Sequence, residues 1–410
     1  MTEPISTTDE PRSLLPAFGY SQYRLLWFST FGTYTGRWTE TAVGAWLVLE
    51  LTNSPLLVGL LGTFRFASML LGPLFGTLSD RFSRRFILLS VQVIYGTAAL
   101  TMFLLFYLSQ LEIWHLFVFT LVGGLANAFD YSTRFAMAAD IVRKNHIYSA
   151  ASSIMAITGI TSALGPLLGG TLLEAIGAGG CFALITASFL LSFLFLLPMK
   201  PVTSTPSKLG STRQNLISGL RYIRNDRVLF SLILIAALVN LFVFPFLFTL
   251  LPIFARDVLH TDATGFGQLM AAVGMGYAAG SILTGALPLS VNKGKLLIIA
   301  VISWPAILLI FSASHLFLLS VILLVFSGIA QGMSLALIQA LLLINCSEEM
   351  RGRVSGARAF AVGALPLGTL LTGYGTGLLG APAVLIINSS ASIVITVLIT
   401  FWASELFKSK

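Results

Sequence analysis

Charged residues are scarce in this sequence. Asp, Glu, Lys and Arg make up 10% of the 410 residues, whereas soluble globular chains carry about 25%. Apolar residues make up 56% and gather in runs of the length that crosses a bilayer, about 20 residues. The composition therefore excludes an ordinary soluble protein and predicts an integral membrane protein in a lipid bilayer.

Cysteine is nearly absent, and no catalytic pattern is present. Cys181 and Cys346 stand far apart in apolar runs, so neither a disulfide nor a metal site is expected. The four histidines lack metal-ligand spacing, and no Ser, His and Asp set or phosphate-binding glycine loop lies between the runs. We therefore expect no enzymatic activity, no cofactor and no metal.

The basic residues form neither a nucleic-acid surface nor a targeting signal. The net charge of +8 is spread over many short loops, without the basic and aromatic surface that binds phosphate backbones. Residues 1–20 are polar and lack the apolar segment of a signal peptide, so the first apolar run is expected to stay in the membrane. No nucleic-acid partner is predicted, and a monomer is expected.

Twelve apolar runs are long enough to span a membrane. Such runs must satisfy their own backbone hydrogen bonds in lipid, so each is predicted to be a helix and the protein to be all-α. The predicted spans are 22–49, 55–78, 86–108, 113–137, 149–176, 180–198, 228–254, 265–289, 296–314, 316–343, 354–378 and 382–403.

The distribution of Lys and Arg predicts the orientation of these spans. All of the 24 Lys and Arg residues except Arg37, Arg65 and Arg256 fall on the side that also holds both termini. Basic loops stay in the cytoplasm. We therefore expect a multi-pass protein of the cell inner membrane with cytoplasmic tails at 1–21 and 404–410, and Arg256 on the opposite side.

A polar segment divides the chain into two six-span halves, 22–198 and 228–403. This cytoplasmic linker, 199–227, is rich in Pro, Ser, Thr and basic residues. Its second part places Leu216, Leu220 and Ile223 at helical spacing among arginines, which predicts an amphipathic helix on the membrane surface. A Gly-Pro segment at 165–170 also has a counterpart at 365–368, and two repeated halves around a central cavity are a transporter architecture.

The loop between the second and third spans carries the most specific motif. Residues 76–85 read Gly-Thr-Leu-Ser-Asp-Arg-Phe-Ser-Arg-Arg. They resemble the Gly-x-x-x-Asp-Arg-x-x-Arg-Arg loop of the major facilitator superfamily, with Ser83 where that family usually has Gly. The matching residues are Gly76, Asp80, Arg81, Arg84 and Arg85. Segments 46–52, 220–222 and 351–354 resemble the branch of enterobactin exporters and related transmembrane secretion effectors.

This resemblance implies the facilitator fold, two pseudo-symmetric six-helix bundles, and a gate at the motif loop. Asp80 would face the N-terminus of the eleventh span, where the helix dipole favours a negative charge. One of Arg81, Arg84 or Arg85 would pair with Asp140 at the end of the fourth span. Such contacts would hold the cytoplasmic gate closed in one state.

Charged residues inside the spans are the candidates for proton coupling. A charge at the bilayer centre costs about 2.5–3.5 kcal/mol on insertion scales, so its presence needs a reason. In the first half four such residues stand out, Arg37, Glu40, Arg65 and Asp130, and Asp130 lies one turn before Arg134. Arg37 and Glu40 share one helix face, as do Asp130 and Arg134, so both sets are also compatible with structural ion pairs.

The second half has no charged residue inside a span except Arg358, near a cytoplasmic end. Ion pairs that only stabilise the fold have no reason to concentrate in one half. The residues of one proton-binding site do have such a reason. We therefore predict that Glu40 and Asp130 carry protons. Desolvation favours their neutral forms, and a cation moving nearer (Arg37, Arg65 or Arg134) favours their charged forms.

Two further sets of residues are predicted to serve transport. A glycine-proline motif in the fifth span resembles that of the superfamily's antiporters, although small residues also serve simple helix packing; it comprises Gly159, Gly165, Pro166, Gly169 and Gly170. An apolar, aromatic cavity with few hydrogen-bonding groups suits a bulky amphipathic ligand, and its predicted residues are Arg37, Trp38, Asn240, Phe244, Gln268, Tyr277, Trp304 and Gln331.

These features together favour a secondary active transporter. The leading interpretation is proton-coupled export of amphipathic small molecules, such as drugs, siderophores or secondary metabolites, by alternating access. Uptake or facilitated diffusion of a metabolite is the alternative. A non-transporting membrane sensor is the rival from another class, although such a sensor normally carries an added soluble domain.

Overall fold

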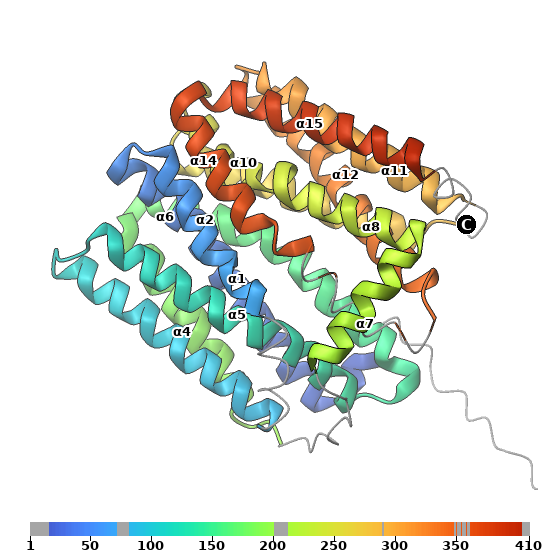
Figure 1. Ribbon diagram of the computed structural model, residues 1–410. Helices are drawn as coiled ribbons and strands as arrows, with labels where there is room; N and C mark the ends of the chain where they lie inside the picture. The colour runs from blue at the N-terminus through green and yellow to red at the C-terminus, as the bar shows by residue number, and fades with distance from the viewer. Residues whose placement is uncertain are drawn as a thin grey trace, which may run out of the picture.

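The protein is helical throughout the part that the structure describes. The computed structural model describes residues 16–71, 82–200, 212–288, 291–347, 350, 354, 358 and 361–403, and no strand occurs among them. The ribbon is a bundle of long helices (Figure 1). The all-α class predicted from the sequence is therefore confirmed for the described residues.

Five α-helices lie in the described ranges of the first half. They are α1 (Ser21–Thr52), α2 (Pro55–Ala67), α4 (Arg84–Tyr107), α5 (Ile113–Ile141) and α6 (Ile147–Leu196). The fifth and sixth predicted spans are merged in α6, and Gly177 lies between them with a φ of 73°. A positive φ is a conformation that glycine adopts without a steric penalty, so Gly177 allows the chain to change direction there.

The second half contains the helices α8 (Arg227–Leu238), α9 (Leu251–Ile253), α10 (Ala263–Gly285), α11 (Lys293–Ser312), α12 (Phe317–Ile344), α14 (Leu365–Leu379) and α15 (Ala381–Trp402). The seventh predicted span runs from Arg227 to Val258. Three of its segments are π-helical: Val239–Val243, Phe246–Leu250 and Phe254–Val258. Pro245 and Pro252 lie beside these segments and supply no backbone N–H, which favours such local departures from the α-helix.

Polar residues next to apolar runs define several helix starts. Ser54, Ser83, Asp226, Asp262 and Asn292 precede α2, α4, α8, α10 and α11. Each side chain accepts a hydrogen bond from the backbone N–H three residues later, at 2.8–3.4 Å. Such caps satisfy an N–H group that the helix itself leaves free.

Among the described residues, two seams carry most of the contacts between the halves. Figure 1 shows the blue-to-green helices of the first half beside the yellow-to-red helices of the second, with α6 packed on α10 and α2 packed on α14. Glycines allow these close approaches. A Cβ atom on Gly59 would lie 2.9 Å from the Cα atom of Gly373, and one on Gly267 would lie 3.3 Å from the Cα atom of Gly170.

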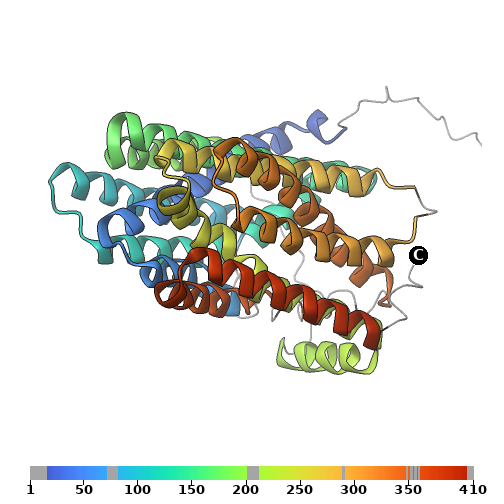
Figure 2. The same ribbon diagram turned by 90° about the horizontal axis from the view of Figure 1, so that it is seen from above.

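A separate helix, α7 (Thr212–Asn225), lies between the halves in sequence and at an edge of the bundle in space (Figures 1 and 2). It coincides with the predicted amphipathic helix. Ile223 is buried, and the Tyr222 hydroxyl accepts a hydrogen bond from the backbone N–H of Ser347 at 3.4 Å. Leu220 is 43% exposed. The location of this helix on a membrane surface stays a prediction. The predicted limits of the domains also stay predictions.

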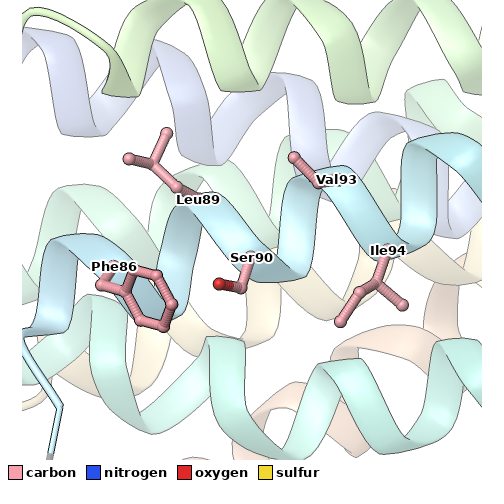
Figure 3. A pocket seen from close by; sticks show the side chains of 5 residues that line it. All are labelled: Phe86, Leu89, Ser90, Val93 and Ile94. Carbon is pink, nitrogen blue, oxygen red and sulfur yellow. The ribbon is translucent and has the colours of Figure 1, made fainter.

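The outer surface of the bundle is apolar. Eight of the described helices are long and apolar enough to cross a membrane, and large apolar side chains such as Phe401 and Ile282 are exposed. Figure 3 shows a hollow on this surface, lined by Phe86, Leu89, Ser90, Val93 and Ile94 of α4. Because four of these five side chains are apolar and three of them are exposed, the hollow suits lipid contact better than polar recognition.

Candidate functional site

Glu40 lies in a buried polar cluster inside the first half. Its side chain is 2% exposed. One of its oxygens, Oε1, accepts hydrogen bonds from Arg65 Nη2 at 2.6 Å and from the Thr120 hydroxyl at 3.1 Å. The other, Oε2, accepts from the Tyr95 hydroxyl at 3.2 Å. Three helices, α2, α4 and α5, thus hold this carboxylate of α1, and its charge is balanced by Arg65.

The ion pair between Arg37 and Glu40 that the sequence suggested is not formed. Arg37 and Glu40 are three residues apart, but Glu40 points into the first half, where Arg65 reaches it from α2. Arg65 is therefore the cation paired with Glu40, and a role for Arg37 in proton coupling stays a prediction. Spacing along one helix could not show this partner, because Arg65 is 25 residues away on another helix.

Asp130 forms the second buried cluster. Arg134 Nε donates to both carboxylate oxygens of Asp130, at 2.9 and 2.7 Å, and this arginine is 0% exposed. Three further donors of its guanidinium bind hydroxyls of α1, those of Ser29, Thr30 and Thr33. The pair of Asp130 with Arg134 is thus present, and four of the five N–H donors of the guanidinium bind described residues.

Sequence reasoning missed the neutral residues that hold these carboxylates. Tyr95 and Thr120 bind Glu40, as described above. Gln92 donates to Asp130 Oδ1 at 3.4 Å and accepts from the Thr33 hydroxyl at 3.0 Å. Gln92 and Tyr95 lie three residues apart on α4, which places them on one helix face. Two polar residues at that spacing in an apolar span were the available signal.

The glycine-proline motif of α6 packs on both halves. A Cβ atom on Gly165 would lie 2.5 Å from Trp38 Cβ and 2.9 Å from the backbone nitrogen of Thr39, so this glycine contacts α1. Gly169 contacts the same helix. Gly159 and Gly170 face α10 of the other half, where Ala278 and Gly267 lie, and the carbonyl of Pro166 is also turned to Gly267. The motif therefore joins α1 to the seam between the halves.

The residues predicted to line a cavity differ in their surroundings. Asn240 is buried and donates to the carbonyl of Ala236 on its own helix at 2.7 Å. Phe244 packs edge-on against buried Trp304, with ring centroids 5.3 Å apart. Gln331 is also buried, within α12. Trp38 is half-buried beside Gly165.

The prediction for Gln268 is wrong. This side chain is exposed on the face of α10 that also exposes Met275 and Ile282. Residues spaced by seven recur on the same side of an α-helix, so Gln268 belongs to the outer apolar surface. Tyr277 lies on another face of α10 and is half-buried.

The motif loop is described only in part. Gly76, Asp80 and Arg81 lie outside the described residues. Arg84 forms an ion pair with Asp140, which joins the start of α4 to the end of α5, as the resemblance implied. Arg85 Nη2 donates to the carbonyl of Leu197 at 2.6 Å. Both contacts stay inside the first half, and the gating role of this loop stays a prediction.

We expect Asp80→Asn to reduce transport by about tenfold or more while leaving membrane insertion intact. The substitution preserves size and removes the charge that the motif uses beside a helix N-terminus. Transport and expression measured on the same vesicles decide this. Normal transport at normal expression would mean that the loop only sets the topology.

The opposite end of the bundle is closed by contacts between the halves. Arg256, from the seventh span, donates through Nη1 to the carbonyl of Leu49 at 2.9 Å and to the side-chain oxygen of Asn53 at 2.8 Å. Leu49 and Asn53 form the C-terminal end of α1, where carbonyl groups and the helix dipole attract a cation. Trp46 also stacks on Phe266, with centroids 5.5 Å apart.

We expect Arg256→Ala to shift the protein toward states in which this end is open. Hydrogen bonds to a charged group are worth about 1.5–3 kcal/mol each, so the equilibrium constant should change by about tenfold or more. Distances between spin labels on the end of α1 and the start of α10 measure the shift. Asp257→Ala is the matched control, because Asp257 pairs with Arg256 in the same segment. Equal distance distributions in Arg256→Ala and the unsubstituted protein would contradict this prediction.

A comparison with known protein families identifies the family of this chain. The family described as transmembrane secretion effector matches residues 13–409. The chain therefore belongs to this family of major facilitator superfamily transporters, which are multi-pass membrane transporters and not enzymes. The resemblance found in the motif loop is confirmed at the level of the family.

Individual relatives agree with this assignment. The chain is 25% identical to the enterobactin exporter EntS of Citrobacter koseri over 327 residues, and 24% identical to that of Shigella flexneri. Both matches cover 78% of each chain. Among solved structures, the nucleoside transporter NupG and a D-xylose–proton symporter each superpose with a TM-score of 0.71 at 14% identity, and cover 92% and 93% of this chain. They cover 99% and 97% of their own chains. These likenesses establish the twelve-helix facilitator fold in two six-helix bundles.

Proposed function

We propose that this transporter exports amphipathic small molecules from the cytoplasm in exchange for protons. The observation that carries the proposal is the pair of buried carboxylates, Glu40 and Asp130, each held against an arginine within the first half. A buried ion pair is a poor source of stability by itself, because desolvation of both charges offsets their attraction. A role in binding and releasing protons would explain why these charged residues are buried inside the first half.

Protonation of either carboxylate would release its arginine. Glu40 is bound to Arg65 of α2, and α2 packs on α14 of the other half. The protonation state of Glu40 would therefore affect the contact between α2 and α14. The two halves must move relative to each other along this contact during alternating access. Asp130 is bound to Arg134, whose other donors hold α1, so it acts on a contact inside the first half.

Relatives support the direction of transport. Several proteins similar to this chain over 78% of their length are enterobactin exporters. The glycine-proline motif of α6, which resembles that of the superfamily's antiporters, supports the same direction. A multi-pass protein of the inner membrane with both termini in the cytoplasm, acting as a monomer, is part of the proposal.

Inverted membrane vesicles provide the test. Accumulation of a panel of dyes, antibiotics and siderophores is measured in vesicles with and without the transporter, and again after a protonophore collapses the proton gradient. We expect accumulation that requires the transporter and falls to the background when the gradient is lost. Equilibration without accumulation would instead favour facilitated diffusion, and the absence of any transported compound would favour a non-transporting sensor.

A further inference from the structure

Tyr95 of α4 is fixed beside Glu40 by contacts with two other helices. Its ring stacks on Phe189 of α6, with centroids 4.2 Å apart, and meets Phe119 of α5 edge-on at 5.6 Å. Tyr95 is 2% exposed, and its hydroxyl donates to Glu40 Oε2 at 3.2 Å. Because aromatic rings of two helices hold the tyrosine ring, the hydroxyl stays beside the carboxylate while the first half is packed.

Gly123 of α5 provides the space that this hydroxyl occupies. A Cβ atom on Gly123 would overlap Tyr95 Oη and would lie 2.7 Å from Tyr95 Cζ. Even alanine at position 123 would therefore push the hydroxyl away from its present place. The hydrogen bond between Tyr95 and Glu40 thus depends on a residue of a third helix that makes no bond to the carboxylate.

The two oxygens of Glu40 are bound unequally. In the described part of the chain, Oε1 accepts hydrogen bonds from Arg65 Nη2 at 2.6 Å and from the Thr120 hydroxyl at 3.1 Å. Oε2 accepts one hydrogen bond, from Tyr95. The oxygen beside Tyr95 is therefore the one that has fewer donors around it and no cation bound to it.

Arg65 and Tyr95 are titratable groups that bind Glu40, and they respond differently to a proton on it. A guanidinium has N–H donors and no acceptor, so Arg65 cannot receive a hydrogen bond from a protonated Oε1. The Thr120 hydroxyl can accept one, but a proton on Oε1 would occupy the oxygen that binds the cation. A tyrosine hydroxyl both donates and accepts, so Tyr95 can bind Oε2 with or without a proton.

We propose that Tyr95 is the positioning residue that directs the proton of Glu40 to Oε2. The inference rests on the role in proton coupling proposed above for Glu40. In the charged state, the Tyr95 hydroxyl donates to Oε2. In the neutral state, the new O–H of Oε2 donates to Tyr95 Oη, and the hydroxyl hydrogen of Tyr95 turns away from the carboxyl group.

This arrangement lets a proton bind and leave while the ring of Tyr95 keeps its place. One hydrogen bond joins Oε2 and Tyr95 Oη in both states, and only its direction changes. Oε1 carries no proton in either state, so it remains an acceptor for Arg65. Loss of the negative charge weakens the bond to Arg65, because a bond between two charged groups is stronger than one with a neutral acceptor.

Infrared difference spectroscopy tests the inference on the purified protein in lipid nanodiscs, without a substrate or a gradient. The spectrum at alkaline pH is subtracted from the spectrum at acidic pH, and the carbonyl stretching band that Glu40→Gln removes belongs to protonated Glu40. A hydrogen bond donated by the carboxyl group lowers the frequency of this band. We therefore expect Tyr95→Phe to move the band to higher wavenumber, and Gly123→Ala, which keeps the tyrosine, to move it in the same direction.

Two matched controls separate this bond from general effects of substitution. Tyr34→Phe makes the same chemical change at a buried tyrosine whose hydroxyl has no hydrogen-bond partner among the described residues. Gly96→Ala adds a methyl group to α4 next to Tyr95, where a Cβ atom would lie at an ordinary distance of 3.5 Å from Phe189 Cβ. Both variants should leave the band in place, and size-exclusion elution shows that each variant is folded.

An unchanged band in both Tyr95→Phe and Gly123→Ala would overturn the inference, and so would the absence of any band that Glu40→Gln removes. If Tyr95→Phe does not fold, Gly123→Ala decides alone. The outcome is distinct from that of the export test in vesicles. A band that depends on Tyr95, without gradient-driven accumulation, would retain the inference and reject proton-driven export. Accumulation that Glu40→Gln uncouples, with an unchanged band in Tyr95→Phe and Gly123→Ala, would do the reverse.

Discussion

Gly165→Leu is expected to abolish transport while leaving a folded protein in the membrane. A Cβ atom at this position would lie 2.5 Å from Trp38 Cβ, 2.9 Å from the backbone nitrogen of Thr39 and 3.0 Å from the carbonyl oxygen of Thr35. Such contacts cannot exist, so α1 and α6 must separate. The Thr39 hydroxyl, which donates to the Gly165 carbonyl at 3.0 Å, would lose this bond.

The expected loss of transport arises because a shift of α1 displaces Glu40 from its partners. Overpacking costs about 1–3 kcal/mol, which a large helical bundle tolerates. However, Glu40 follows Thr39 directly, so a shift of α1 displaces the carboxylate from Arg65, Tyr95 and Thr120. We therefore expect transport per folded molecule to fall below about one-tenth, measured in vesicles and normalised to the folded fraction.

Gly377→Leu is the matched control, because a Cβ atom on Gly377 of α14 has nothing within 4 Å. It should transport as the unsubstituted protein does. If Gly165→Leu lowers the thermal midpoint but leaves transport per folded molecule unchanged, the motif serves packing alone and has no part in the transport cycle.

Hydropathy was sufficient to predict where several of the described helices lie. In the described ranges, the predicted spans 86–108 and 265–289 correspond to α4 (Arg84–Tyr107) and α10 (Ala263–Gly285). The membrane explains why the predicted spans agree with the observed helices. In lipid, each run must form its backbone hydrogen bonds within itself, and a helix does so. The break between the fifth and sixth spans depends on a single glycine, Gly177, and could be placed only approximately.

Side-chain partners were harder to predict than helices. The spacing of Arg37 and Glu40 suggested a pair, yet Arg65 of another helix takes the place of Arg37, because helix packing decides which face of α1 meets α2. Gln268 was assigned to a cavity from its polarity alone, and it lies on the outer surface. Asp130 with Arg134 was predictable, because both partners lie on one helix at a spacing of four. Contacts between helices far apart in sequence, such as Arg256 with the end of α1, leave no local pattern.

Glu40→Gln is expected to uncouple transport from the proton gradient. The amide has the shape of the protonated carboxyl group and cannot ionise, so the variant is fixed in one state of the proposed cycle. Substrate exchange between compartments of equal pH should survive, whereas accumulation driven by a pH gradient should fall to the level found without a gradient. Both are measured in the same proteoliposomes with a substrate identified in the vesicle panel.

The variant leaves Arg65 without its counter-ion, and breaking a buried pair in this way costs about 3–5 kcal/mol. The double variant Glu40→Gln with Arg65→Gln removes both charges and keeps two side chains of similar size. It separates loss of the proton carrier from loss of fold, since it should be as stable as the unsubstituted protein and still uncoupled. Full gradient-driven accumulation by this double variant would show that Glu40 is not the carrier.

Asp130→Asn decides between the two carboxylates. Asp130 and its partner Arg134 are as deeply buried as Glu40, but their bonds hold α5 to α1 inside the first half, whereas Arg65 lies on the helix that packs against α14. A proton on Glu40 can therefore loosen the seam between the halves, and one on Asp130 acts only within the first half. We accordingly expect Asp130→Asn to slow exchange and accumulation together, while Glu40→Gln removes accumulation alone. Uncoupling by Asp130→Asn with normal coupling in Glu40→Gln would move the carrier to α5, and normal accumulation in both variants would reject proton antiport through these residues.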